Sequence, residues 1–166
     1  EKEASYTTFG AKIASEGEAS PAYLANRGLT GWGIAHCFEF PGYIRLSNTD
    51  SSSGNMYGIL TTPKLTALSG PTSITLTFDA VRFASTSDIP VKVLGAGTIK
   101  TASVRIEEGT AETAITPAAD GQSIAITPTH CPKHANDDFK KWSCFTLTID
   151  GATAETQIRW DTTGVG

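Results

Sequence analysis

The chain has 166 residues, 39% of them hydrophobic, which is enough for one well-buried core, and no composition shift marks a second domain, so residues 1–166 are predicted to form a single domain. Thirteen basic and seventeen acidic side chains give a formal net charge of −4, and no basic run exceeds Lys140-Lys141. Nucleic acid and anionic membranes, which are bound through clustered Lys and Arg, are therefore not expected partners. No stretch approaches the roughly 20 consecutive apolar residues that a membrane-spanning helix needs.

Residues 1–30 differ from the rest of the chain and are predicted to cover one end of the fold. Residues 6–10 carry a weak strand pattern and are expected at a sheet edge. Ser20 and Pro21, followed by Ala-Tyr-Leu-Ala-Asn-Arg and Gly28, predict one short helix. Ser caps helix N-termini, Pro is tolerated in the first turn, and Gly commonly follows the last turn.

From Gly31 onward, short β-prone runs alternate with turn pairs such as Pro41-Gly42 and Asp150-Gly151. Eight strands are predicted, near residues 42–47, 57–62, 73–83, 90–95, 101–107, 122–127, 143–150 and 155–161. The segments between them are too short for the crossover helices of a parallel sheet. The fold class is therefore predicted as all-β, an antiparallel two-sheet β-sandwich of jelly-roll type with one short N-terminal helix, and a barrel is the nearest alternative.

Two runs alternate apolar and polar residues with the two-residue period of a half-buried strand. Ile74, Leu76 and Phe78 are expected to face the core together with Phe145, Leu147 and Ile149, and the intervening threonines to face outward. No further strand pattern follows Trp160. The last strand therefore either leaves an unpaired edge or is closed by a strand from earlier in the chain.

The three cysteines, Cys37, Cys131 and Cys144, cannot all pair within one chain. Cys131 and Cys144 bracket a polar connection, so a disulfide could close that loop if the protein lies outside the cytoplasm, and Cys37 would then be a buried free thiol. The sequence leaves the pairing open. Cys131 and His134 have C-x-x-H spacing, and Cys144 could add a third zinc ligand. This zinc pattern is weak because a closed structural site needs four ligands, so a disulfide or an inert loop is favoured.

Residues 48–55 begin with the oxygen spacing of a calcium loop, but Gly54 is one place late for the EF-hand turn and Ile59 stands where the bidentate Glu belongs. A plain polar loop is favoured here. No cofactor is predicted, and only a structural calcium held by groups from distant parts of the chain is left open.

Catalysis has little support, because no nucleophile elbow, zinc-protease helix or phosphate-binding loop is present in the sequence. Glycoside hydrolysis needs two carboxyl groups that flank one bond. The available carboxylates are Glu39, Asp79, Asp88, Glu107 and Glu108. Their spacing does not define a pair, so the chain is predicted not to be an enzyme.

Aromatic residues next to turns are the better indication of binding, because a flat ring on a rigid scaffold can stack on a sugar while polar neighbours bond its hydroxyls. Trp142 and Trp160 lie beside or within strands and are expected to serve core packing. The candidate ligand-binding residues are Trp32, His36, Tyr57 and Arg82.

Three runs carry a resemblance to a known family: Gly42-Tyr-Ile-Arg-Leu-Ser47, Gly58-Ile-Leu-Thr-Thr-Pro-Lys-Leu65 and Ser73-Ile-Thr-Leu-Thr-Phe-Asp-Ala80. They resemble a block of the jelly-roll, galactose-binding-like modules of secreted bacterial lipoproteins, which are similar to carbohydrate-binding modules. The stretch Trp142-Ser-Cys-Phe-Thr-Leu-Thr-Ile-Asp-Gly-Ala-Thr153 and the stretch Thr156-Gln-Ile-Arg-Trp160 resemble that family's penultimate strands, so the resemblance spans about residues 31–161.

The resemblance implies a non-catalytic accessory domain, secreted or at the bacterial cell surface, with carbohydrate or a cell-surface protein as partner and further domains in a longer chain. It transfers no binding residue. In such domains a strand with paired Asp residues commonly follows the position of Trp160, and its absence here puts a calcium site built from that strand in doubt. The alternatives are a structural or adhesive protein-interaction domain and, less favoured, a small glycoside hydrolase.

Overall fold

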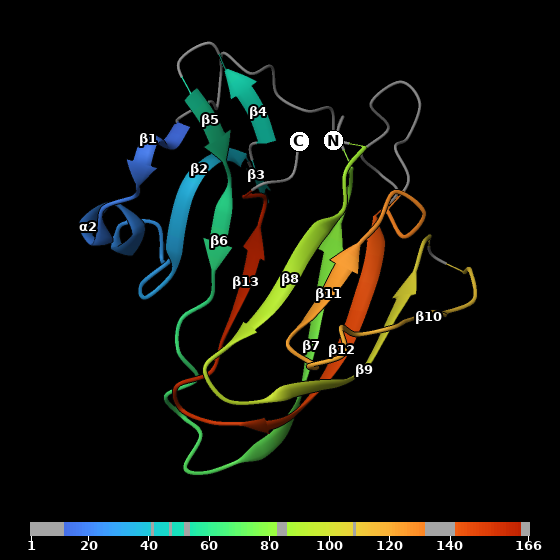
Figure 1. Ribbon diagram of the computed structural model, residues 1–166. Coiled ribbons are helices and arrows are strands. Elements are labelled where there is room, and N and C mark those ends of the chain that lie inside the picture. The colour runs from blue at the N-terminus through green and yellow to red at the C-terminus, as the bar shows by residue number, and fades with distance from the viewer. Residues whose placement is uncertain are drawn as a thin grey trace.

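The computed structural model describes residues 12–40, 42–46, 48–51, 54–82, 86–107, 109–131 and 142–163. In this part of the chain, antiparallel strands form two large sheets and one small ribbon, accompanied by one short helix (Figure 1). The predicted all-β sandwich with a short N-terminal helix is confirmed. The predicted strand at residues 6–10 lies outside the described residues.

The first sheet has seven strands, six of which form the ordered path β1-β2-β6-β13-β8-β11, while β3 pairs with β2. Their bounds are β1 Lys12–Glu18, β2 Gly33–Phe40, β3 Tyr43–Leu46, β6 Ile59–Thr61, β8 Ile89–Leu94, β11 Ser123–Ile126 and β13 Gln157–Asp161. The second sheet has the order β10-β9-β12-β7, with β7 Thr72–Ala80, β9 Thr98–Arg105, β10 Thr113–Ile115 and β12 Ser143–Ala152. The ribbon pairs β4 Asn48–Ser51 with β5 Gly54–Tyr57.

The eight strands from β6 to β13 have jelly-roll connectivity. Within the first sheet these strands lie in the order β6-β13-β8-β11. Within the second sheet they lie in the order β7-β12-β9-β10. This is the double Greek key of a jelly roll. Strand β13 lies between β6 and β8, so the partner that closes the last strand is β6, from earlier in the chain.

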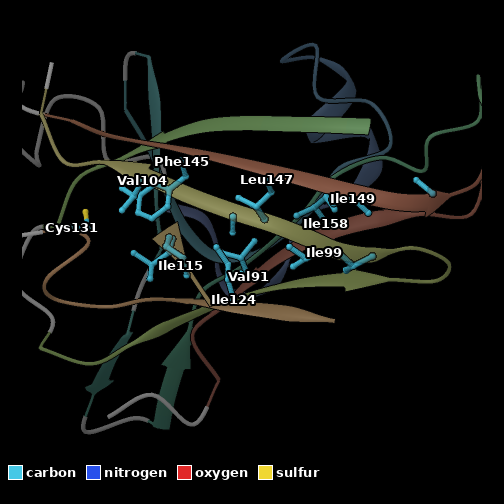
Figure 2. Packing of buried hydrophobic residues seen from close by; sticks show 14 residues of the cluster. Val91, Ile99, Val104, Ile115, Ile124, Cys131, Phe145, Leu147, Ile149 and Ile158 are labelled. Carbon is cyan, nitrogen blue, oxygen red and sulfur yellow. The ribbon is translucent and has the colours of Figure 1, made fainter. Parts of the chain in front are cut away.

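The second sheet presents an apolar face to the core, as its alternation predicts. The facing pairs across β12 and β7 are Phe145 with Phe78, Leu147 with Leu76 and Ile149 with Ile74. All three β12 side chains are fully buried, and Figure 2 shows them packed over Val91 and Ile158 of the first sheet. Phe78 stacks on Phe145 and meets Trp160 edge-on, with ring centroids about 5 Å apart in both pairs, so the packing role expected for Trp160 is confirmed.

One apolar row crosses the first sheet from β2 to β11. Directly paired residues lie on the same face of a sheet, and the pairs Ile34–Leu60, Leu60–Trp160, Trp160–Val91 and Val91–Ile124 join five strands. Val91, Ile124 and Trp160 pack in the main core against the second sheet. Ile34 and Leu60 pack in a second cluster, which the helix completes.

Helix α2, Pro21–Ala25, forms as the sequence predicts. The Ser20 hydroxyl accepts a hydrogen bond from the Tyr23 amide at 3.2 Å, Pro21 occupies the first turn, and Gly28 takes a left-handed φ of 72° in the turn that follows. Leu24 is 3% exposed and packs against Ile34 and Cys37. The helix therefore covers the part of the apolar row that lies beyond the narrower second sheet.

Four regions differ from the sequence prediction. The segment at residues 48–55 was expected to be a polar loop, and its described residues belong to the β4–β5 ribbon instead. Strands β1 and β2 were not predicted. Strand β2 shows no two-residue period, because buried residues occupy neighbouring positions in its sequence Gly-Ile-Ala-His-Cys-Phe-Glu-Phe. Strand β10 is only three residues long, which is too short for a pattern to be seen.

Asp161 provides a pH-dependent contact at the end of β13. Its Oδ2 accepts a hydrogen bond from Lys92 at 3.2 Å and its Oδ1 accepts one from the Thr163 amide at 2.9 Å. Burial acts to raise the pKa of this carboxyl, but the hydrogen bonds from Thr163 and the charge of Lys92 outweigh it and hold the pKa below its ordinary value. The ionised form of Asp161 therefore stabilises the fold.

We predict that Asp161→Asn lowers the free energy of unfolding by roughly 1–2 kcal/mol at pH 7, because a buried charged hydrogen bond is lost. A depressed carboxyl pKa contributes stability above the unfolded value, near pH 4, and that stability is lost as the pH falls through the folded value. Urea unfolding at pH 7 and at about pH 3 measures this. The prediction would be contradicted if the difference in free energy of unfolding between wild type and variant were as large at pH 3 as at pH 7.

Candidate functional site

The structure separates the four residues proposed for ligand binding. Trp32 immediately precedes Gly33, which pairs with Thr61 at one end of β6, while Tyr57 lies just before the other end. At about 3.3 Å per residue, Thr61 and Tyr57 are roughly 13 Å apart along the chain. Trp32 is half-buried against the cluster of Leu24, Ile34 and Cys37.

His36 lies nearer to Tyr57, at a point where β2 changes partners. One edge of β2 pairs with β6 up to Ala35 and with β3 from Cys37 onward. His36, between them, has a φ of 48°, and it is the only non-glycine residue with positive φ in the described part of the chain. Its Nδ1 is buried and has no hydrogen-bond partner among the described residues. Such backbone outliers persist where the surrounding structure imposes them and are frequent at functional sites.

Arg82 follows β7 on the second sheet and belongs to a different environment. Burial lowers the pKa of its guanidinium, and the nearby Cys131 and Asp88 act in the opposite direction. The structure thus brings His36 toward Tyr57 and leaves Trp32 and Arg82 in two other places. The binding roles of these four residues stay predictions.

A compact polar and aromatic cluster lies where helix α2 meets β2, and it is called the α2–β2 corner below. It consists of Tyr23, Arg27 and Glu39. Arg27 Nε donates to Glu39 Oε2 at 2.6 Å, and the Tyr23 hydroxyl donates to the same oxygen at 3.3 Å. The Arg27 guanidinium carbon lies 3.7 Å from the centroid of the Tyr23 ring, in cation–π geometry.

The corner is held in one geometry but remains open to solvent. The Arg27 and Glu39 side chains are 33% and 34% exposed. The hydrogen bond to Glu39 raises the pKa of Arg27, and burial, with the negative charge of Glu39, raises the pKa of the Tyr23 hydroxyl against the opposing charge of Arg27. The corner therefore presents a charged guanidinium and a protonated phenol at neutral pH, both hydrogen-bonded to the Glu39 side chain.

Sequence reasoning missed the corner, although one signal was available. Tyr23 and Arg27 are four residues apart across the predicted helix and the turn after it, a spacing that places two side chains on one face. Glu39 was considered only as one of several scattered carboxylates. Its approach to the helix depends on β2, which the sequence pattern did not predict.

The disulfide considered for Cys131 and Cys144 is not formed, and Cys37, Cys131 and Cys144 are all free thiols. Side chains alternate along β12, so Ser143 and Phe145 face the core while Cys144 faces outward. Cys131 is 3% exposed at one end of the core cluster (Figure 2) and meets Ser143, whereas Cys144 meets Asp79 and Arg105. The two sulfurs therefore lie on opposite sides of the sheet.

The same alternation separates two of the three suggested zinc ligands, Cys131 and Cys144. His134 lies outside the described residues, and within the described ranges no group of three metal-binding side chains occurs. Burial raises the pKa of the Cys37 thiol to about 12 and also raises the pKa of Cys131, so both are inert neutral thiols. The buried free Cys37 is confirmed.

The carboxylates considered for hydrolysis lie on different elements. Glu39 belongs to the α2–β2 corner, Asp79 lies near the end of β7 beside Cys144, and Asp88 lies near Arg82. Glu107 is in the turn after β9, where its backbone carbonyl accepts from Thr110, and Glu108 lies outside the described residues. The polar segment once compared with a calcium loop is the β4–β5 ribbon.

Comparisons with protein-family models, with curated proteins and with solved structures find no match to this chain. The part of the chain that the structure describes has one helix, α2, and it is too short to cross a membrane.

We predict that a thiol reagent at mildly alkaline pH labels Cys144 alone in the native protein and all three cysteines in denaturant. Burial and Asp79 raise the pKa of the Cys144 thiol as well, but Cys144 is partly exposed, whereas Cys37 and Cys131 are buried and out of reach of the reagent. Mass spectrometry of the labelled peptides measures this. Only one reactive thiol in non-reducing denaturant would show a disulfide and contradict the prediction.

We predict that His36→Gly is more stable than His36→Ala by about 1 kcal/mol, because only Gly adopts the left-handed conformation without strain. Both variants remove the imidazole, so the difference between their free energies of unfolding in urea reports the cost of the left-handed backbone at position 36. Equal stability of the two variants would show that the backbone at position 36 relaxes without strain.

Proposed function

We propose that the chain is a non-catalytic carbohydrate-binding module and that the α2–β2 corner is its binding site. The observation that carries this proposal is the corner itself. It holds an aromatic ring, a guanidinium and a carboxylate in one geometry on a rigid sandwich, and the side chains of Arg27 and Glu39 are each about one third exposed. Sites that bind small polar ligands combine apolar or aromatic surface with a few precisely placed polar groups. The jelly-roll fold is also one that lectin domains use.

The corner has unused hydrogen-bonding capacity suited to sugar hydroxyls. Both internal hydrogen bonds end on Glu39 Oε2, and among the described residues Glu39 Oε1 accepts none. Arg27 uses Nε for Glu39, which leaves its terminal nitrogens as donors to a ligand. A carboxylate that accepts and a guanidinium that donates can together bond neighbouring hydroxyls of one sugar ring.

Aromatic surface is available on the same side of the molecule. Tyr23 and Trp32 both pack against the cluster of Leu24, Ile34 and Cys37, and both remain partly exposed. The apolar face of a pyranose can stack on such a ring. Trp32 is not part of the corner, since six residues of β2, about 20 Å, separate its neighbour Gly33 from Glu39. In this proposal it is a second stacking position for a glycan longer than one sugar, while Tyr57 and Arg82 belong to other regions of the surface.

The cellular setting is part of the proposal and rests on the resemblance to galactose-binding-like accessory domains. We infer a secreted or surface-anchored bacterial protein, such as a lipoprotein, in which this domain accompanies others. The carbohydrate ligand would then be a glycan met outside the cell. Free thiols do not distinguish compartments here, because the two buried cysteines are protected by the fold rather than by pairing.

We predict that the wild-type protein binds a subset of glycans on an array, and that Glu39→Gln and Trp32→Ala each weaken that binding by roughly tenfold or more, since a charged hydrogen bond or a stacked ring is lost. Calorimetry with the best array ligand gives the affinities. Circular dichroism and the melting temperature establish that each variant is folded.

The matched control is the exposed ion pair between Lys64 and Glu155, whose side chains are 50% and 68% exposed. Glu155→Gln removes a charged partner, as Glu39→Gln does, and is expected to leave affinity unchanged. No glycan binding by the wild-type protein would refute the function. Binding that survives both Glu39→Gln and Trp32→Ala but is lost in Tyr57→Ala or Arg82→Ala would keep the function and move the site.

A further inference from the structure

Strand β7 forms one edge of the second sheet and is long and regular. It has nine residues, Thr-Ser-Ile-Thr-Leu-Thr-Phe-Asp-Ala, and among the described strands it pairs only with β12. Figure 1 shows β7 beside β12 in the second sheet. An edge strand presents a row of backbone N–H and C=O groups to which another strand can pair.

This edge lacks the features by which proteins block strand pairing. Edges are commonly short, bulged, or interrupted by Pro or Lys. β7 contains no Pro, Lys, Arg or Gly, and its pairing with β12 is regular from Ile74 to Ala80. The opposite edge of the same sheet, β10, has only three residues, and the register between β1 and β2 at the edge of the first sheet is irregular.

The inward side chains of β7 are incompletely covered. Ile74, Leu76 and Phe78 are each half-buried, whereas their partners Ile149, Leu147 and Phe145 on β12 are fully buried. The difference arises because β12 has neighbours on both sides and β7 has one in the described chain. A further strand beside β7 would cover this remaining apolar surface.

The sequence of β7 is complementary to itself in an antiparallel register centred on Leu76. In that register Leu76 lies opposite Leu76 of a second copy, Ile74 lies opposite Phe78, and Thr75 lies opposite Thr77. Ser73 lies opposite Asp79, so no two carboxylates of β7 face each other. Directly opposed residues share a face, so apolar residues meet on the core side and threonines meet on the outer side.

Charge is also compatible with this register. Asp79 is the only charged residue of β7, and a hydroxyl rather than a second carboxylate lies opposite it. Ser73 itself donates to Asp150 at 2.6 Å, and Lys100 lies 3.2 Å from the other oxygen of Asp150. Asp150, the carboxylate that Ser73 contacts, is therefore already paired with a cation.

We propose that β7 is the self-association surface of this protein, through which two copies pair antiparallel about a two-fold axis at Leu76. The two four-stranded sheets join into one continuous sheet across the dimer. The interface is isologous, which is the commonest arrangement of soluble homodimers. This inference is independent of the proposed carbohydrate site, which lies on the other sheet.

The test uses charges on the exposed outer positions of β7. In Thr75→Lys/Thr77→Lys, each new lysine lies opposite a lysine of the second copy, and in Thr75→Glu/Thr77→Glu each glutamate lies opposite a glutamate. Sedimentation equilibrium is expected to show a wild-type dimer and self-association weakened by roughly tenfold or more in each double variant. An equimolar mixture of the two variants is expected to restore the dimer as a heterodimer.

Thr101→Lys is the matched control, because Thr101 is exposed on the same outer face but lies on β9, inside the sheet. It is expected to dimerise as wild type does. A monomeric wild-type protein would overturn the proposal, and if its β7 amides were nevertheless protected from hydrogen exchange, another segment of the chain would be the occupant. A dimer that persists in both charged variants, or a mixture that stays monomeric, would also overturn it.

Discussion

The apolar row that crosses the first sheet is the constraint on which the rest of the structure depends. It runs from Ile34 through Leu60, Trp160 and Val91 to Ile124, and each member lies on the same face. The second sheet has four strands and the first has seven, so the second sheet cannot cover the whole row. Helix α2 and the residues around it cover the remainder, through Leu24. The position of the candidate site follows from this difference in width.

The corner is a by-product of how that helix is attached. Leu24 enters the small cluster with Ile34 and Cys37, and the polar face of the helix segment then meets Glu39 farther along β2. Between these contacts β2 changes partners at His36, where the backbone turns left-handed. This irregularity changes which of the following residues face the core, so that Cys37 is directed toward Leu24. Helix packing, strand pairing and the corner are therefore coupled through one short segment.

Side-chain alternation has a different consequence on the second sheet. It separates Cys131 from Cys144, so these two residues neither form a disulfide nor share a metal site. It also places Thr75, Thr77, Thr146 and Thr148 together on an outer face that is entirely polar at these positions. Strand β7 forms the edge of this sheet. Its apolar and polar residues alternate as those of β12 do, but it has only one described neighbouring strand. Its regular pattern, which made it easy to predict, also makes its edge suited to pairing.

The sequence by itself determined the all-β class, the short capped helix, the inward and outward faces of strands β7 and β12, and the burial of Cys37. Each of these depends on local periodicity or on a few neighbouring residues, as in Ser20-Pro21 or in Ile74, Leu76 and Phe78. Tertiary structure decided the rest. Strand β2 was not predicted because its residues are buried on both faces and its backbone turns left-handed at His36, and the corner could not be predicted without β2. The separation of Trp32 from Tyr57, and of Cys131 from Cys144, depends on which strands pair and on which face each residue takes, and these follow from contacts between segments far apart in the chain.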